Sequence, residues 1–504
     1  MSATPPGDGI PYGTRIDQMA DLHGDSTAVV FASEDGRERT LTWREIARRS
    51  NQLAHVFAGL GLGVGDHLAI CLRNSPEHLV CCFAGWKVGA TVVPMRWDLP
   101  DWELDRLHAV LEPTLAIDRT NLDDLLEESR HAPEDPLPEV VSPRGWGVCS
   151  SGSTGAPKVI VQKNPALFFP AISPTSSVVA SFGPMDPEQR VLCPAPLYHT
   201  NGVTAFRNLL TGDPIVLMER FDAELALDLI ERHRITGFIA ATPMLQRMAQ
   251  APGIEDRDLS SLSWVQQGAA ALPLWLGRFW IELVGPEHFF MSYGASETIG
   301  IVVCRGDQWL AHPGTLGKGL NDTEIRVLGP DGEDLPPGEI GTIYLRQGAG
   351  PLATYLGKDV APMESTEDGF SSVGDLGWLD EDGFLFMADR RVDMIVTGGV
   401  NVFPAEVEAA LSGHPGIADV VVVGLRDPAW GRRVHAIVQR GALDLAAEDV
   451  VAFAKERLAP YKVPKTVEFV ELIPRTEAMK FNRAALVAER EDPEVGQDAP
   501  VGTN

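Results

Sequence analysis

The stretch CSSGSTGAPKVI, residues 149–160, gathers glycine and small hydroxyl residues in front of a lysine. Its glycines let the backbone turn N–H groups toward one point, its hydroxyl side chains add donors, and its lysine adds a positive charge. Such a loop can hold phosphate oxygens, whereas a glycine-rich surface loop is the plain alternative for this stretch taken alone. The residues concerned are Ser151, Gly152, Ser153, Thr154, Gly155 and Lys158.

The position of the lysine excludes the common nucleotide-binding pattern G-x-x-x-x-G-K-[ST]. Here the lysine follows the second glycine by three residues, and valine rather than serine or threonine comes next. The stretch therefore predicts a phosphate ligand without naming the reaction.

Several sequence blocks resemble motifs of the adenylate-forming superfamily, which comprises acyl-CoA synthetases, firefly luciferases and peptide-synthetase adenylation domains. The blocks occur along this chain in the same order as in that superfamily. SGSTGAPK resembles the phosphate loop of that superfamily, and YGASE at 293–297 resembles its Y-G-x-[TS]-E motif. The blocks that follow are GEIGTIYLR at 338–346, SVGDLGWLDEDGFL at 372–385, DRRVDMIVTGGVNVFPAEVE at 389–408 and PRTEAMKFNR at 474–483. The resemblance thus covers nearly the whole chain.

The resemblance implies a reaction in two halves. A carboxylate attacks the α-phosphate of Mg-ATP to give an acyl-adenylate and pyrophosphate, and a thiol, usually that of CoA, then displaces AMP. Cations and N–H donors must offset the repulsion between the two anions and stabilise the transition state. The implied activity is that of an AMP-forming acid–thiol ligase with ATP, Mg²⁺ and CoA as cofactors.

The resemblance also implies which residues carry this chemistry. Lys480 matches the lysine that bridges carboxylate and α-phosphate, and Glu297 matches the carboxylate associated with Mg²⁺, a cation that prefers oxygen ligands. Ser296 stands where many members have threonine, and either hydroxyl can donate to the α-phosphate. Asp375 matches the carboxylate that accepts the ribose hydroxyls, and Arg390 matches the arginine that supports ribose and phosphate.

The adenine and acyl sites are implied by two shorter segments. QQGAAALP at 266–273 resembles the strand whose small residues admit the adenine, although small residues also suit tight packing. PLYHTNG at 196–202 resembles the superfamily's P-[LM]-x-H-x-x-G segment, which implies that His199 lies at the wall between the acyl and nucleotide sites. No second metal ligand stands at ligand spacing, so we interpret His199 as a gate or shape residue. The adenine set is Gly268, Ala269, Ala270 and Tyr293, and the acyl set is His199, Thr200, Asn201, Phe206, Met244, Gly294, Ala295 and Gly300.

The expected substrate is a hydrophobic carboxylic acid, with room for a bulky or extended one. An amino acid is disfavoured, because the aspartate that the superfamily uses for amino acids is absent after the YHTNG region. Met244 has a plain alternative as a residue of a core helix.

A mobile C-terminal domain is implied as well. We expect an N-terminal domain at 1–390 and a C-terminal domain at 391–504, with Arg391 and Val392 at the hinge. Gly398 and Gly399 resemble the loop that lines the pantetheine tunnel of CoA, where glycine gives the thiol arm room.

Two positions depart from the superfamily's pattern. Val392 replaces a pivot that is commonly aspartate or lysine, and Met479 replaces the glycine before the catalytic lysine. Neither change removes a residue that adenylation needs. The two changes therefore bear on the second half-reaction, thioester formation. Besides a CoA ligase, the sequence leaves open an enzyme that passes its acyl-adenylate to a carrier protein or a partner ligase in trans. A silent binding protein is a third hypothesis, which the intact lysines and carboxylates oppose.

The elements that must position these residues alternate between strand and helix. Segments around 66–95 and 190–272 predict strand, helix, strand units and hence parallel sheets covered by helices. From Gly314 onward, short strands joined by Asp-Gly and Pro-Gly turns predict a small β-barrel-like part. The fold class is therefore α/β: a large N-terminal domain of stacked mixed α/β sheets with this β-barrel-like part, followed by a smaller α+β C-terminal domain.

The composition and charge of the chain limit its partners and its location. The 504 residues are 44% hydrophobic, and the formal net charge of −28 disfavours a nucleic-acid partner. The sequence predicts no membrane span, no signal peptide, and a cytoplasmic protein whose six cysteines are reduced core residues. The expected partner is a small-molecule carboxylic acid.

Overall fold

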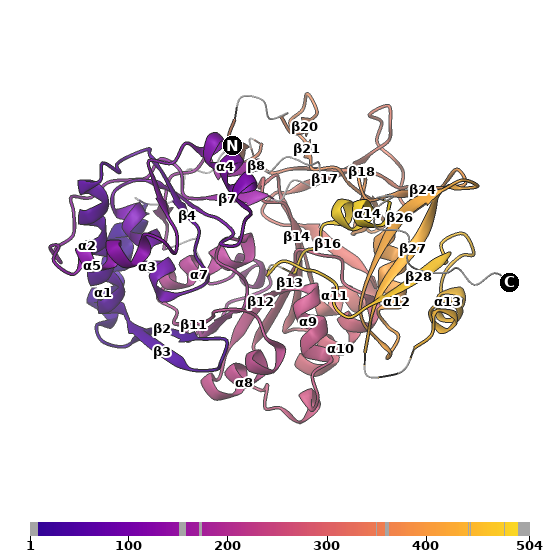
Figure 1. The fold of residues 1–504 in the computed structure, drawn as a ribbon, viewed down its shortest axis with the longest axis horizontal. Helices are drawn as coiled ribbons and strands as arrows, with labels where there is room; N and C mark the ends of the chain where they lie inside the picture. Colours follow the sequence, from indigo (N-terminus) through magenta and orange to yellow (C-terminus); the bar gives the residue numbers. More distant parts are fainter. Residues whose placement is uncertain are drawn as a thin grey trace.

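The computed structural model describes residues 9–150, 158–170, 174–348, 350–357, 362–441, 443, 445–477 and 479–491. A long mixed sheet crosses the N-terminal part (Figure 1), and its parallel strands agree with the alternating sequence pattern. The parallel strands are β2 (Thr27–Ala32), β11 (Ile215–Met218), β10 (Val191–Cys193), β12 (Gly237–Ala241), β13 (Trp264–Gly268) and β14 (Phe289–Gly294), with β3 (Glu38–Thr42) antiparallel to β2 at the edge.

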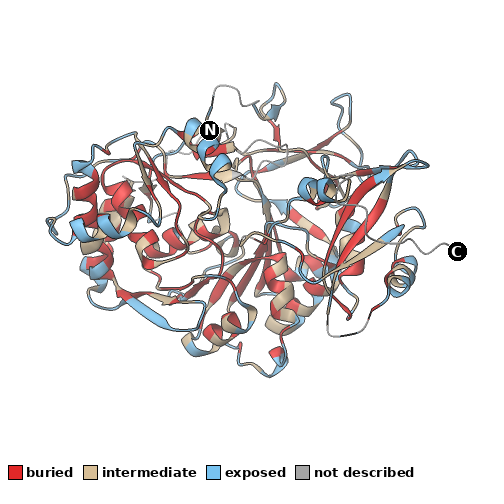
Figure 2. Cartoon of the chain, in the orientation of Figure 1, coloured by how far each residue is buried: buried red, intermediate tan, exposed pale blue. Residues whose placement is uncertain are grey.

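Helices begin and end at the residues that can cap them. The Asp222 carboxylate accepts the Leu225 N–H at the start of α8 (Ala223–His233), and Gly212 closes α7 (Thr200–Thr211) with a φ of 99°. The other helices of this region are α6 (Ser177–Ala180), α9 (Thr242–Ala249), α10 (Leu274–Val284) and α11 (Gly306–Ala311). Apolar side chains of α8, α9, α10 and the parallel strands form one buried cluster, and those of α6 and α7 belong to a second, with buried residues seen in red in Figure 2.

The first 170 residues add one small sheet and two strands of another, which a strand from farther along the chain completes. In the first, β4 (His67–Ile70), β5 (Thr91–Pro94) and β6 (Leu115–Ile117) are parallel, and in the second β8 (Lys158–Gln162) lies between β7 (Gly147–Ser150) and β19 (Ala353–Tyr355). The helices and short strands are α1 (Tyr12–His23), α2 (Trp43–Gly59), α3 (Pro76–Lys87), α4 (Asp101–Leu111), α5 (Leu122–Ser129), β1 (Ile10–Pro11) and β9 (Leu167–Phe168). The predicted strand, helix, strand unit around 66–95 is confirmed as β4, α3 and β5.

The predicted β-barrel-like part is a run of antiparallel strands joined to the long sheet through β15. It contains β15 (Ile301–Arg305), β16 (Thr315–Gly319), β17 (Glu324–Leu328), β18 (Gly341–Arg346), β20 (Glu364–Ser365), β21 (Ser371–Ser372), β22 (Asp375–Leu379) and β23 (Leu385–Arg390). In the β22–β23 pair, Asp375 stands in register with Arg390. The antiparallel pairing of β22 with β23 thus brings two predicted site residues together.

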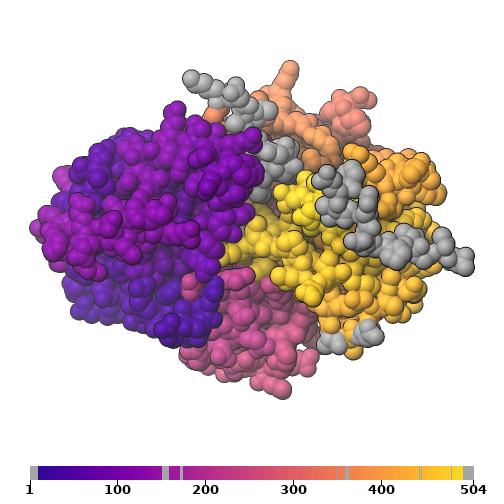
Figure 3. All heavy atoms as spheres, in the orientation of Figure 1, coloured from indigo at the N-terminus to yellow at the C-terminus, as the bar shows by residue number. Residues whose placement is uncertain are grey.

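The C-terminal part is a smaller α+β unit with its own apolar core, as expected. It comprises β24 (Ile395–Thr397), β25 (Val400–Val402), α12 (Pro404–Leu411), β26 (Ile417–Asp427), β27 (Gly431–Arg440), α13 (Ala447–Lys455), β28 (Thr466–Val470) and α14 (Arg483–Glu491). In Figure 3 its yellow atoms lie between the purple N-terminal region and the pink middle of the chain. Among the described residues, no helix combines the length and apolar character needed to cross a bilayer.

Candidate active site

A buried carboxylate marks the centre of the site. The Tyr293 hydroxyl on β14 donates to Oδ2 of Asp375 at 2.8 Å, and Nε of Arg390 lies 3.5 Å from Oδ1. Burial raises the pKa of Asp375, whereas Arg390 and the Tyr293 hydrogen bond act in the lowering direction. Within the described part of the chain, Oδ1 is buried without a hydrogen-bond partner.

An unsatisfied buried carboxylate oxygen is costly unless a ligand supplies a donor. A ribose offers two adjacent hydroxyl donors, which suit an acceptor-only carboxylate. The predicted assignment of Asp375, with Tyr293 and Arg390 beside it, therefore fits a nucleotide sugar.

A second carboxylate, Glu297, is held by a residue that sequence reasoning missed. The Tyr355 hydroxyl on β19 donates to Oε1 of Glu297 at 2.7 Å, and Nζ of Lys158 lies 4.4 Å from the centre of the Tyr355 ring. Only the pairing of Tyr355 with Ile160 across β19 and β8 brings these residues together, so no local motif could have revealed Tyr355. Its hydrogen bond orients the carboxylate predicted to hold Mg²⁺.

Replacing Tyr355 with phenylalanine is expected to weaken this orientation while keeping the ring under Lys158. A lost hydrogen bond to a charged acceptor is worth about 1.5–3 kcal/mol, part of which water restores at this half-buried position, so the apparent affinity for Mg-ATP should fall ~3- to 10-fold. Titration of initial rate against Mg²⁺ at fixed ATP measures the change. An unaltered Mg²⁺ dependence would remove Tyr355 from the site.

Two predicted residues from distant segments also meet. Oγ1 of Thr200, the first residue of α7, lies 3.1 Å from Oγ of Ser296. The following turn is held by Gln162, whose amide donates to the Thr298 hydroxyl at 3.2 Å. The structure thereby joins the residue predicted for the acyl pocket to the one predicted for the α-phosphate.

Lys480 reaches this cluster from the C-terminal part. Its side chain is exposed, yet burial in the surrounding protein and the charge of Arg390 lower its pKa to about 8, while Glu297 acts in the opposite direction. Two segments of very different sequence position therefore converge on one charged site.

The lowered pKa of Lys480 predicts a pH dependence. The ammonium form is present below about pH 8 and is lost above it, so kcat/KM for ATP should decline as pH rises through about 8. Lys480→Arg keeps its charge over this range and should lose that decline, although at a lower rate because the guanidinium has a different shape. A decline of equal midpoint in both enzymes would assign it to another group.

His199 is neutral at physiological pH. Burial, followed by the charge of Lys480, lowers its pKa to about 3. It also caps α7, where its Nδ1 accepts the Asn201 N–H at 3.4 Å. A neutral imidazole fixed in this way suits the predicted gate or shape role.

The segment predicted to admit adenine runs along the end of β13. Ala269 has a φ of 70°, and the amide of Gln267 donates to the Ala270 carbonyl at 2.6 Å. Gly268 is buried and packs beside Ser292 of β14, where an added Cβ would lie 3.3 Å from its hydroxyl oxygen. Ala269 and Ala270, which follow directly after β13, are exposed.

The other acyl-pocket predictions lie in different surroundings. Met244 is buried in the core cluster of α9, and Phe206 packs edge-on against Phe83 and Trp86. Gly294 and Ala295 follow directly from Tyr293, whereas an added Cβ at Gly300 would meet Thr323. These assignments stay predictions. Ser151, Gly152, Ser153, Thr154 and Gly155 lie outside the described residues, between β7 and β8.

The predicted hinge and CoA residues are at the surface. Arg391 pairs with Glu364 at 2.8 Å, and Val392 is 58% exposed. Gly398 and Gly399 form the turn between β24 and β25, with φ of 57° and 80°. Figure 1 places β24 at the outer edge of the C-terminal part, away from β13 and β14.

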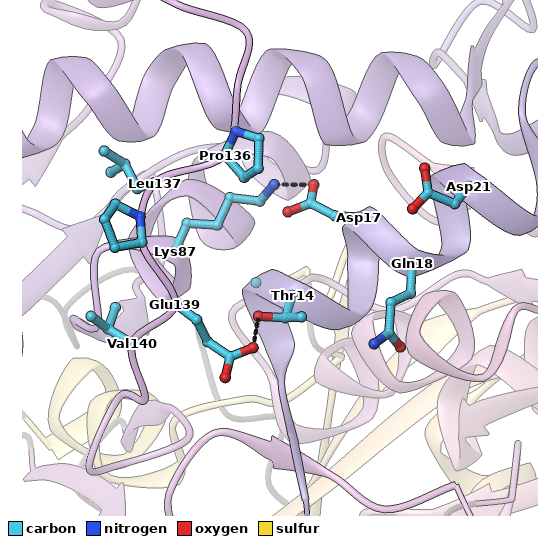
Figure 4. Close-up of a pocket in the computed structure, with 11 residues that line it drawn as sticks. Thr14, Asp17, Gln18, Asp21, Lys87, Pro136, Leu137, Glu139 and Val140 are labelled. Carbon is cyan, nitrogen blue, oxygen red and sulfur yellow. Dashed lines mark hydrogen bonds and ion pairs between the residues drawn. The ribbon is translucent and has the colours of Figure 1, made fainter.

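A surface cavity between α1 and residues 136–140 lies apart from this site (Figure 4). The buried Lys87 ammonium bonds to carboxylate Oδ1 of Asp17 and to the Asn51 side chain, and the Thr14 hydroxyl donates to Glu139 at 2.7 Å. Its buried cation is already paired, which marks a structural ion pair rather than a ligand site.

Comparisons with known proteins agree with the geometry. Residues 16–145 and 148–356 match the model of the AMP-binding enzyme family, and residues 406–480 match that of the AMP-binding enzyme C-terminal domain. A feruloyl-CoA synthase from an Amycolatopsis species is 32% identical over 88% of this chain and 92% of its own length. A fatty acid–acyl-carrier-protein ligase from Streptomyces coeruleorubidus is 31% identical over 89% of this chain and 91% of its own.

The structure is also similar to that of an o-succinylbenzoate CoA synthetase from Bacillus subtilis in complex with its acyl-adenylate intermediate. The TM-score is 0.80 with 28% sequence identity, and the match covers 99% of this chain and 100% of the other.

Proposed function

The chain belongs to the AMP-binding enzyme family, and from that membership we propose that it is an ATP-dependent acyl-CoA ligase acting on a hydrophobic carboxylic acid. The observation that carries this proposal is that Lys480 of the C-terminal part lies within electrostatic reach of Arg390 and Glu297 of the N-terminal part. A reaction between two anions requires cations gathered at one point, and here they come from both parts of the chain.

In the first half-reaction, a carboxylate oxygen of the acid attacks the α-phosphorus of ATP, and the bond to pyrophosphate breaks. The Lys480 ammonium bridges the two anions and stabilises charge on the pentavalent transition state. Asp375 holds the ribose, Arg390 supports ribose and phosphate, and Ser296 donates to the α-phosphate. The acid enters ionised, so neutral His199 shapes the wall between the two substrates without moving a proton.

Glu297 is the residue that would hold Mg²⁺, because its carboxylate offers hard oxygen ligands. The ion would supply charge neutralisation to the phosphates of ATP. Tyr355 fixes the direction of that carboxylate, and the Lys158 ammonium, which lies over the Tyr355 ring, adds a further positive charge.

In the second half-reaction the CoA sulfur attacks the acyl carbonyl, the bond to AMP breaks, and the thiol proton leaves to solvent. We infer a domain boundary at 390/391 with Arg391 and Val392 as the hinge. Rotation there would bring the Gly398–Gly399 turn, now at the outer edge, to the acyl-adenylate. Both glycines have a positive φ and carry no side chain, so a pantetheine arm could pass close to this turn.

An aryl or long-chain acid is the substrate class we favour. The relatives' names specify feruloyl, o-succinylbenzoate and fatty acyl groups, all of which place a hydrophobic body behind the carboxylate. The small side chain of Ala295 would leave room for such a body, whereas Thr323 and Leu345 fill the space beside Gly300. Six free cysteines and the use of ATP and CoA favour the cytosol as its location.

An acyl-carrier protein that acts in trans is the alternative acceptor of the acyl group. Met479, which occupies the position before Lys480 where the superfamily has glycine, favours it, and so does the relative named as an acyl-carrier-protein ligase. Both acceptors present the same pantetheine thiol to the same acyl-adenylate.

Product analysis by mass spectrometry separates these functions. A panel of aliphatic, aryl and polycyclic acids is incubated with Mg-ATP alone, with CoA, or with a phosphopantetheinylated carrier protein. Acyl-CoA formed only when CoA is added is the expected result and names the acid. Acyl-adenylate that accumulates beside CoA but disappears with the carrier protein would favour the alternative, and no adenylate from any acid would contradict both.

A further inference from the structure

The loop that carries Lys480 is a tight hairpin. The Thr476 N–H donates to the Lys480 carbonyl at 2.8 Å, and the Met479 N–H donates to the Thr476 carbonyl at 2.8 Å. Arg475 braces the loop, because it donates to the Met479 carbonyl at 2.8 Å and pairs with Asp419 at 2.7 Å. The backbone position of Lys480 therefore depends on the conformation of Met479.

Met479 adopts a conformation that its side chain disfavours. Its φ is 60°, in the left-handed region where glycine meets no steric penalty and a residue with a Cβ does. A three-residue hairpin loop that ends in this conformation ordinarily has glycine there. Some compensating contact must hold methionine in this place.

The compensation is burial against the other part of the chain. Met479 is 8% exposed and belongs to the apolar cluster built from β12, β13, α8, α9 and α10. Of the described residues in that cluster, it alone comes from beyond Trp309. Its thioether thus attaches the Lys480 loop to the N-terminal part.

Neighbouring contacts point the same way. Burial raises the pKa of Glu477 in the same loop, and the charge of Arg73 in the N-terminal part opposes that rise. The Gln246 amide on α9 also donates to the Ala418 carbonyl at 3.3 Å. The Trp275 indole N–H on α10 likewise donates to the Ser412 hydroxyl at 3.1 Å, so polar contacts to α9 and α10 accompany the apolar contact of Met479.

We propose that Met479 is a positioning residue that docks Lys480 onto the N-terminal part and thereby favours the adenylate-forming arrangement over the thioester-forming one. The inference rests on the proposed function, since it assigns Met479 a part in the same two half-reactions. Rotation of the C-terminal part must withdraw Met479 from the apolar cluster, so docking accelerates the first half and delays the second.

Three substitutions separate the side chain from the backbone. Met479→Leu keeps an apolar group of similar volume, Met479→Ala removes it while retaining the strained φ, and Met479→Gly removes both the group and the strain. Single-turnover acyl-adenylate formation is measured for each enzyme, and thioester formation is measured separately from synthetic acyl-adenylate and CoA. The second assay also verifies that each variant is folded.

We expect Met479→Ala and Met479→Gly to form acyl-adenylate at least ~10-fold more slowly, because a buried apolar side chain shifts a two-state equilibrium by about one or more orders of magnitude. Thioester formation should be unchanged or faster, and Met479→Leu should resemble the parent enzyme. The alkaline limb of adenylation should also move above about pH 8 in the alanine and glycine variants, because an undocked Lys480 is better solvated.

Parental adenylation rates and an unmoved alkaline limb in both Met479→Ala and Met479→Gly would overturn the inference. So would a loss of both half-reactions in equal measure, which would indicate a purely structural role. A parent enzyme that forms no acyl-adenylate from any acid would instead contradict the proposed function.

Discussion

Replacing Lys480 with alanine is expected to slow acid-dependent pyrophosphate release by ~10²- to 10³-fold, the loss typical of removing one preorganised group that stabilises transition-state charge. The reason is geometric, since Lys480 lies within electrostatic reach of Arg390, Glu297 and His199. Coupled detection of pyrophosphate with saturating acid measures the change.

The same variant carries its own control. Lys480 acts in the first half alone in this mechanism, so thioester formation from synthetic acyl-adenylate and CoA should stay within about twofold of the parent. Lys465→Ala serves as a matched loss of an exposed lysine in the same part of the chain and should leave both steps intact. Unchanged pyrophosphate release in Lys480→Ala would exclude the lysine from adenylation.

Replacing Asp375 with asparagine is expected to raise the KM for ATP by ~10²-fold, because hydrogen bonds to a charged acceptor are worth about 1.5–3 kcal/mol each and two ribose hydroxyls are involved. The KM for the acid should change little. Glu381→Gln removes an equal charge from the exposed turn after β22 and should alter neither constant.

The unfolding temperature of Asp375→Asn distinguishes a loss of ATP binding from misfolding. A carboxylic acid whose pKa is raised by folding binds its proton more tightly in the native state, so its contribution to stability falls as pH rises through that pKa. Ionised Asp375 therefore costs stability at neutral pH, and Asp375→Asn should unfold at an equal or higher temperature there. A lower unfolding temperature together with the higher KM would mean that the substitution damaged the fold.

Much of the site could be predicted because its residues lie in contiguous motifs. Tyr293, Ser296 and Glu297 share one strand end, and Asp375 and Arg390 are delivered by a single antiparallel pair. Alternating strand and helix patterns likewise predicted the parallel sheets, since burial on both faces of a sheet leaves a strong apolar signal.

What sequence reasoning missed depends on contacts between distant segments. Tyr355 meets Glu297 only through the register of β19 with β8, which no local pattern encodes. The sequence marks Met479 as unusual, but its burial among residues before 310 follows only from the way the C-terminal part packs.

Transfer of oxygen from the acid to AMP tests the central claim most directly. The enzyme is given an acid labelled with ¹⁸O in both carboxylate oxygens, with Mg-ATP and CoA, and the AMP is analysed by mass spectrometry. Attack of the carboxylate on the α-phosphorus, followed by cleavage of the acyl–oxygen bond by the thiol, predicts one ¹⁸O atom in AMP. Unlabelled AMP formed at the same rate as the thioester would contradict an acyl-adenylate and, with it, the roles of Lys480 and Asp375 in its formation.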